Sequence, residues 1–361
     1  MPLPFILAAA AVAAAGYGAK KAYDGYTDKE AAERIVSGAK RRYEAAKDNY
    51  DFTREKVDTG LEELGQLQLD IGQSFTEFER LAKDLSEKLN THNPKNARKF
   101  ELPLSQQKLD RMKALEISTT SFLATAGVAG IAGIGAAYAT YGGVMALGAA
   151  STGTAISALS GVAATNATLA ALGGGSLAAG GFGMAGGTLI LGSVVAAPIL
   201  AIAGWAYANH GEEARSKARE IDREANKAVK SYHAAKSKLE RISSYISEID
   251  HHTRKLFAEF KVDYFDELKE ISFFLENVEN KEDRKIHLDS QGNEIIKRLE
   301  NGYILAAILT DLVLTPLFKS ETNDDGEPEL EKDNLGLPIL NDEALDAAIE
   351  KKDNELDDFE K

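Results

Sequence analysis

The feature that most constrains this chain is an uncharged segment from Ile117 to Gly211, 95 residues without Asp, Glu, Lys or Arg. This segment holds 20 of the 31 glycines, and Ala, Ser, Thr, Val, Leu and Ile supply most of the rest. A water-soluble domain normally carries charged side chains on its surface, so a segment of this length must be covered. Lipid, charged helices of the same chain and further copies of the segment are the three coverings we expect.

Within the uncharged segment, small residues recur four positions apart, which places them on one face of a helix. Such faces let two helix backbones approach closely, as in membrane helix pairs. In water a helical glycine costs up to ~1 kcal/mol relative to Ala, so this glycine content requires tight packing or lipid to offset it. The residues we expect at membrane or oligomer contacts are Ala126, Gly130, Gly133, Ser157, Gly161, Ser176, Gly180, Gly183, Gly187 and Trp205.

Three stretches of this segment are candidate membrane spans, namely residues 122–150, 155–172 and 188–208. The first and third reach the ~20 apolar residues that a bilayer crossing requires. Basic residues flank the segment on both sides, among them Arg111 and Arg215. Because basic flanks favour the cytoplasmic side, this pattern predicts an even number of crossings.

Two heptad seams lie outside the segment, at residues 43–89 and 214–260, and each is 47 residues long. Apolar residues recur there at alternating spacings of three and four, which is typical of a coiled coil. Matched lengths on either side of one segment favour antiparallel pairing of the two seams, although a bundle with another helix, or a dimer, gives the same pattern. The principal seam residues are Tyr50, Val57, Leu64, Ile71, Phe78, Leu239, Ile242, Ile246, Ile249 and Leu256.

These patterns predict an all-α fold, an elongated antiparallel coiled-coil or helical-bundle stalk with a Gly/Ala-rich hydrophobic helical block. The domains we expect are an apolar N-terminal helix (1–27), a first stalk segment (28–116), the glycine-zipper block (117–211), a second stalk segment with C-terminal helices (212–320) and an acidic, largely disordered tail (321–361). We also expect a turn at residues 289–293 and one helix near 343–359 within the tail. The tail carries 16 acidic residues against 4 lysines, most of the formal charge of −14.

The N-terminus begins with an apolar, Ala-rich stretch that Lys20 and Lys21 follow. A secretory signal peptide carries its basic residues before the apolar run instead. We therefore expect a helix that stays in the folded protein, with a signal peptide as the alternative.

The sequence offers little for catalysis. The protein has no Cys, which excludes disulfides, thiolate metal sites and a cysteine nucleophile. The run from Gly148 to Thr154 lacks the lysine that a phosphate-binding loop requires. Glu248 and His252 are four residues apart, but zinc needs three or four converging ligands. We predict no enzyme activity, no catalytic, cofactor-binding or metal-binding residues and, given the acidic charge, no nucleic-acid partner.

The run from Ala150 to Ser157, with that from Leu172 to Gly181, resembles a widespread family of largely uncharacterised bacterial glycine-zipper and coiled-coil proteins. The opening Met1 to Pro4 and the run from Gly16 to Lys21 resemble the start of the same family, and the likeness covers residues 1–260. More loosely, the composition of the segment is similar to apolipoprotein L and to interferon-inducible glycine-zipper membrane proteins. This resemblance implies membrane insertion, channel activity and host defence, and it assigns no catalytic residue.

Our first hypothesis is a membrane-active, non-enzymatic protein that inserts the uncharged segment and oligomerises with copies of itself to permeabilise or remodel a bilayer. We expect it in the bacterial cytoplasm, conditionally associated with the inner membrane, with the acidic tail as a candidate surface for a protein partner. A soluble helical scaffold or adaptor, with the segment as its core, is the second hypothesis. A lipid-carrying protein, with the segment as its acyl-binding core, is the third.

Overall fold

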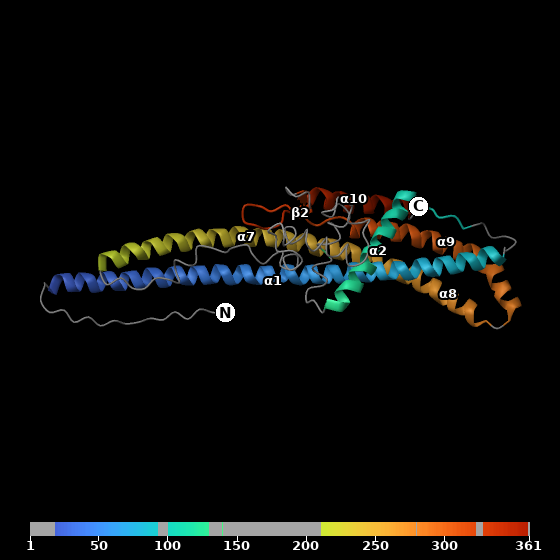
Figure 1. The fold of residues 1–361 in the computed structure, drawn as a ribbon, viewed down its shortest axis with the longest axis horizontal. Helices are drawn as coiled ribbons and strands as arrows, with labels where there is room; N and C mark the ends of the chain where they lie inside the picture. The colour runs from blue at the N-terminus through green and yellow to red at the C-terminus, as the bar shows by residue number, and fades with distance from the viewer. Residues whose placement is uncertain are drawn as a thin grey trace. The chain divides into compact units, whose positions relative to one another are not determined.

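The structure, a computed structural model, describes residues 19–92, 100–129, 139, 211–278, 280–322 and 328–359. Of these residues 87% are helical, which confirms the all-α prediction. The elements in chain order are α1 (Ala19–His92), α2 (Gln106–Ala129), α7 (Gly211–Glu259), the π-helix η3 (Phe260–Phe265), α8 (Asp266–Asn277), α9 (Lys281–Val313), β1 (Ser320–Thr322), β2 (Pro328–Leu330) and α10 (Asp342–Phe359) (Figure 1).

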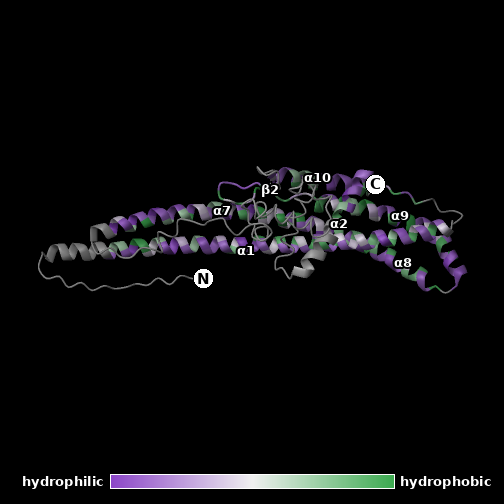
Figure 2. Ribbon diagram, viewed as in Figure 1, coloured by the Kyte–Doolittle hydropathy of each residue, from purple (hydrophilic) through white to green (hydrophobic). Residues whose placement is uncertain are grey.

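The chain forms two compact units, and the long helices α1 and α7 contribute to both. The two-helix unit comprises residues 1–56, 193–241 and 335–337, of which the structure describes α1 to Lys56, α7 to Arg241 and the short C-terminal piece. The larger unit comprises residues 57–192, 242–334 and 338–361. Hydrophilic residues predominate along the coloured parts of both long helices, with hydrophobic residues interspersed (Figure 2).

In the two-helix unit, α1 and α7 pack through a seam made mostly of alanine. Buried alanines include Ala32, Ala39 and Ala46 on α1, and Ala218, Ala225, Ala228 and Ala235 on α7. Arg42 of α1 pairs with Asp222 of α7, and the ring centroids of Tyr50 and Tyr232 lie 5.4 Å apart. Higher residue numbers on α1 therefore meet higher numbers on α7, so the two helices run parallel.

The same direction holds within the larger unit. A Cβ at Gly60 would lie 3.1 Å from Cγ2 of Ile246, and the rings of Phe75 and Phe260 are 5.3 Å apart. The predicted antiparallel stalk is therefore wrong. A heptad repeat fixes which face of a helix is buried but leaves the direction of its partner open. The 47-residue match between the seams was not evidence for direction.

Aromatic side chains form the centre of the larger unit. The ring of Phe78 lies 5.2 Å from that of Phe260 and 5.0 Å from that of Tyr303. Phe260 and Phe265 begin and end η3, and both are buried. A Cβ at Gly302 would lie 2.8 Å from Cζ of Phe78, so the glycine lets this ring lie against the α9 backbone.

Helix α9 is continuous from Lys281 to Val313, so the predicted turn at 289–293 is wrong. Its start is well specified, since the Asn280 side chain accepts a hydrogen bond of 3.0 Å from the backbone N–H of Glu282. Gly292 lies inside the helix, and Leu288 and Ile295 on either side of it are buried. Tertiary packing on this face offsets the helical cost of glycine.

The C-terminal region from 328 to 359 is folded, so the prediction of a largely disordered acidic tail is wrong there. Strands β1 and β2 pair antiparallel, with Ser320 opposite Leu330. Helix α10 follows, close to the helix expected near 343–359, and it buries Leu345. The apolar residues between the acidic ones were the missed signal, because they supply a buried face that a disordered segment lacks.

The uncharged segment is described only in part. Ala126 lies in α2, whereas the other expected contact residues of the segment, from Gly130 to Trp205, lie outside the described residues. Among the helices that the structure describes, none combines the length and apolar character needed to cross a membrane.

Candidate functional site at the α2, α9 and α10 junction

Helix α2 carries the chain from charged sequence into the uncharged segment. The Ser105 carbonyl accepts a hydrogen bond of 3.1 Å from the backbone N–H of Leu109, which closes the first turn. The helix then continues without a break past Glu116, the last charged residue before the segment, to Ala129. The contacts that hold the first turns of α2 therefore also position the start of the uncharged segment.

Asp311 of α9 joins three helices. Its Oδ1 lies 3.0 Å from Nη1 of Arg111 on α2, and its Oδ2 pairs with Nζ of Lys351 on α10. The Asp311 residue is only 9% exposed, and a buried carboxylate is costly unless cations pair with it. Its two cationic partners explain how α9 accommodates an acid in an otherwise apolar stretch.

Glu355 of α10 forms a second bridge to α2. Its Oε1 lies 2.9 Å from Nζ of Lys108 and 3.8 Å from Nζ of Lys351. Lys351 therefore touches both acids, and the pairs form one connected group. We call Lys108, Arg111, Asp311, Lys351 and Glu355 the ion-pair network. A partly buried network orients the helices it joins more effectively than isolated surface pairs do.

Apolar contacts with the core and a close contact with the α1 backbone also fix α2 in place. Leu115 is 1% exposed and lies in the hydrophobic core. Thr119, inside the uncharged segment, is also 1% exposed and packs on Gly72 of α1, where a Cβ would lie 2.8 Å from Cβ of Thr119. The start of the uncharged segment is thus covered by a charged helix of the same chain.

A carboxyl pair marks the boundary of the uncharged segment. Burial, together with the charge of Glu79 and a hydrogen bond to it, raises the pKa of Glu116 above its ordinary value. Two carboxyls this close favour sharing one proton over carrying two charges. This contact between α1 and α2 therefore tightens when Glu116 is protonated.

A lysine and a histidine anchor α10 to α7. Lys352 is 7% exposed, and its Nζ lies 3.0 Å from Nδ1 of His252 and 2.6 Å from Oδ1 of Asp353. An ammonium group only donates, so Nδ1 accepts and the imidazole is neutral with its proton on Nε2. Burial, and then the charge of Lys352, lowers the pKa of His252. A second contact joins the Tyr245 hydroxyl to Oδ1 of Asp346 at 3.1 Å.

All ten principal seam residues, from Tyr50 to Leu256, are buried. The ion-pair network was missed by sequence reasoning, although one signal for it was present. Asp311 is the single charged residue between Glu300 and Lys319, and an isolated acid in an apolar helix predicts a buried cationic partner.

Within the described residues, no group of three or more His, Asp or Glu side chains is arranged to hold a metal ion. His252 faces Lys352 rather than a ligand set with Glu248. Comparisons with protein-family models, curated proteins and solved structures gave no match for this chain.

Proposed function

We propose that this protein is membrane-active and non-enzymatic. It inserts the uncharged segment Ile117–Gly211 into a bilayer and oligomerises, which permeabilises or remodels that bilayer, and a defence role is a natural extension. The observation that carries this proposal is the continuity of α2 across the boundary at Ile117. Because of it, one helix links the uncharged segment to contacts that the rest of the protein can make or release.

Insertion requires several of the described contacts to open. Thr119 has to leave the surface of Gly72 before residues 117–129 reach lipid. Arg111 and Lys108 then lose Asp311 and Glu355, and they become free to interact with lipid headgroups. These pairs are partly exposed, so water and headgroups compensate much of the loss.

In the bilayer, the small-residue faces of the segment supply the association between helices. Hydrophobic burial gives little driving force between helices in lipid, and close backbone packing replaces it. The lipid bilayer and further copies of this chain are therefore the proposed partners.

A reversible clamp on α2 tests the proposal. The chain has no native Cys, so a Gly72→Cys/Thr119→Cys pair yields a single disulfide between α1 and α2. The Cβ spacing of 2.8 Å is shorter than a disulfide needs, so α1 and α2 must separate by about 1 Å. We expect the oxidised protein to lose dye release from vesicles and dithiothreitol to restore it.

The matched control is Gly60→Cys/Ile246→Cys, which joins α1 to α7 across a Cβ spacing of 4.0 Å and leaves α2 unclamped. This variant should release dye whether oxidised or reduced. Wild-type protein that neither floats with vesicles nor releases dye would refute the proposed function. Equal release by the oxidised and reduced α2 clamp would refute the part that requires α2 to move.

A soluble scaffold with the uncharged segment as its core is the second candidate. The burial of Thr119, and of Ala139 at 3% exposed, favours it, because both residues belong to that segment. This scaffold requires the segment to stay covered. Protein that remains in the supernatant with every vesicle composition, with α2 protected from hydrogen exchange throughout, would support it over insertion.

A further inference from the structure

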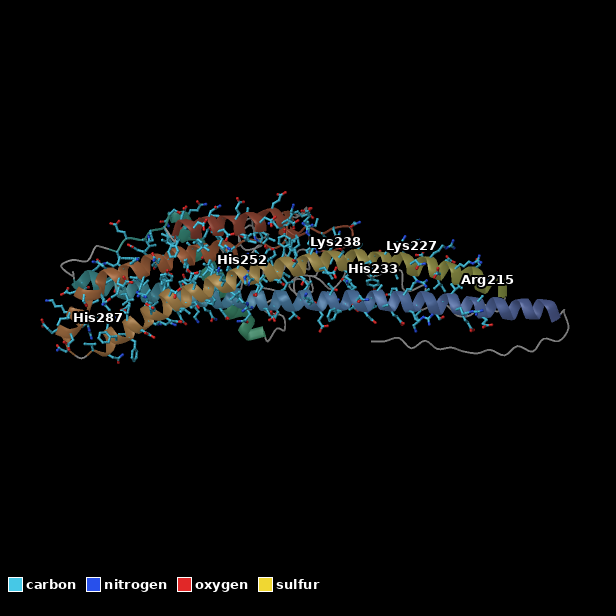
Figure 3. All side chains as sticks on the ribbon, turned by 180° about the vertical axis from the view of Figure 1, so that it is seen from behind. Arg215, Lys227, His233, Lys238, His252 and His287 are labelled. Atoms are coloured by element: carbon cyan, nitrogen blue, oxygen red, sulfur yellow. The ribbon has the colours of Figure 1, made fainter. Side chains whose placement is uncertain are left out.

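The outer face of α7 in the two-helix unit is strongly cationic. From Arg215 to Arg241, seven basic side chains are exposed against two acidic ones, Glu220 and Glu240. The seven are Arg215, Arg219, Arg223, Lys227, Lys230, Lys238 and Arg241. Arg215, Lys227 and Lys238 are labelled along α7 in Figure 3.

Most of these cations share one side of the helix. Arg219, Arg223, Lys227 and Lys230 follow one another at spacings of three and four, which brings them onto a single stripe. The seam residues of the same turns are buried against α1. The cationic stripe therefore faces away from α1, and we call it the α7 basic face.

Acids of α7 offset this charge only in part. Asp222 pairs with Arg42 of α1, so its negative charge is neutralised by a cation of the other helix. Glu224 pairs with Lys227 at 2.7 Å, and Glu240 pairs with Lys236 at 2.7 Å. The face keeps a net positive charge after these pairs are formed.

The two stretches of α1 and α7 that we compare with this face lack its charge excess. On α1 between Glu30 and Lys56, exposed cations and acids are nearly balanced, four against five. Farther along α7, from Ile242 to Glu259, two basic residues stand against three acidic ones. A general solvating surface would be expected to distribute its charges more evenly.

The position of the face points to its partner. Helix α7 begins at Gly211, where the uncharged segment ends, and the first cations follow within about three turns. Cations next to a bilayer-inserting segment lie at the depth of the lipid headgroups, where anionic lipids attract them.

We propose that the α7 basic face docks on anionic lipid headgroups and positions the uncharged segment at the bilayer. This inference rests on the proposed function, since the bilayer is the same one into which the segment inserts. The face would add affinity for anionic bilayers that weakens with salt, because screening shortens the reach of exposed charges.

The test compares vesicles of phosphatidylcholine alone with vesicles that also contain phosphatidylglycerol. The full chain carrying Arg219→Gln, Arg223→Gln and Lys230→Gln should bind the anionic vesicles more weakly, about fivefold per neutralised cation and about 100-fold for the three. Binding to phosphatidylcholine alone should change little. Raising the salt concentration should reduce wild-type binding more than binding by the variant.

The matched control neutralises three exposed cations of α1 in the same unit, Arg34→Gln, Arg41→Gln and Lys56→Gln, with the same change in net charge. It should retain wild-type affinity. An equal loss in both variants, or no loss in the α7 variant, overturns the inference, as does wild-type binding without preference for anionic lipid. Dye release from phosphatidylcholine vesicles separates the two proposals, because it persists if only the docking inference is wrong and is absent if insertion itself is wrong.

Discussion

The two units use the same helix pair with very different side chains. In the two-helix unit, the α1–α7 seam is mostly alanine, with a buried pair of tyrosines whose hydroxyls are 3.1 Å apart at Tyr43 and Tyr232. In the larger unit, Phe78 of α1 packs on Phe260 and Phe265 of η3, which directly follows α7, and on Tyr303 of α9. An aromatic side chain buries about 150–250 Å², far more than alanine does, so the larger unit holds most of the stabilising burial.

This difference distinguishes two properties of a heptad repeat, namely which face of a helix it buries and how strongly that face is packed. The repeat determines which face of each helix is buried, and it does so equally in both units. The size of the seam residues determines how strongly that face is held. We therefore expect the two-helix unit to open more readily than the larger unit, while it carries the α7 basic face.

The largest expected effect tests the aromatic centre. Phe78→Ala should destabilise the larger unit by about 3–5 kcal/mol, because it removes a ring that contacts three other aromatic side chains. Chemical denaturation would measure the loss, and hydrogen exchange would assign it to the larger unit. Phe52→Ala is the control, since Phe52 is 71% exposed on α1 in the two-helix unit, and it should stay within about 0.5 kcal/mol of wild type. Similar losses in both variants would contradict the assignment of stability to the aromatic centre.

A smaller effect is expected at the close approach of α1 and α2. Gly72→Ala places a methyl group 2.8 Å from Cβ of Thr119, so α2 must shift, at a cost of about 1–3 kcal/mol. Hydrogen exchange over residues 106–116 would report the loosened helix.

Gly60→Ala is the matched control for that change. Its new Cβ meets the terminal Cγ2 of Ile246 at 3.1 Å, and the gain in helix propensity of up to ~1 kcal/mol offsets this contact. It should be close to neutral. Unchanged exchange in α2 of the Gly72→Ala variant would show that Gly72 does not control the approach of the two helices.

The seams could be predicted because apolar periodicity reports burial directly. Every principal seam residue, from Tyr50 to Leu256, is buried as its spacing indicates. Helix direction could not be predicted, since parallel and antiparallel partners bury the same a and d positions. The pairing of Tyr50 with Tyr232, which reveals the direction, becomes visible only when both helices are placed.

The candidate site was harder to predict because it depends on charges far apart in the sequence. Asp311 was detectable as one acid in an apolar stretch, but its partners Arg111 and Lys351 lie on two other helices. The acidic composition of the tail also concealed that residues 328–359 are folded, although a helix near 343–359 was expected. Its acids are engaged in specific pairs, such as Glu355 with Lys108, whereas bulk charge alone favours disorder.

The smallest expected effect is a pH dependence confined to the larger unit. The pKa of His252 in the folded protein lies below its ordinary 6.5, so the unfolded chain binds this proton more readily. The contribution of neutral His252 is therefore present above about pH 6.5 and is lost as the pH falls toward the folded pKa. The surroundings of His252 determine the direction of its pKa shift. Burial, Lys352 and His251 disfavour the charged imidazolium. Asp353 and Glu248 favour it, but more weakly than burial opposes it.

Acidification from about pH 7.5 to about pH 5.5 should therefore reduce the hydrogen-exchange protection of α10, because protonated His252 can no longer accept from Lys352. Asp353 contributes in a separate pH window, since Lys352 lowers its pKa and its stabilising charge is lost only as the pH falls below 3.8.

His252→Gln should flatten the response of α10 between pH 7.5 and 5.5, about one unit on either side of the ordinary histidine pKa. The reason is that an amide oxygen accepts a hydrogen bond from Lys352 at both pH values. His233→Gln, an exposed position on α7 in the two-helix unit, should leave the response intact. A loss of α10 protection that survives His252→Gln would place the acid-sensitive group elsewhere. The carboxyl pair of Glu79 and Glu116 is distinguishable from that group, because it tightens on protonation and should increase protection in α2.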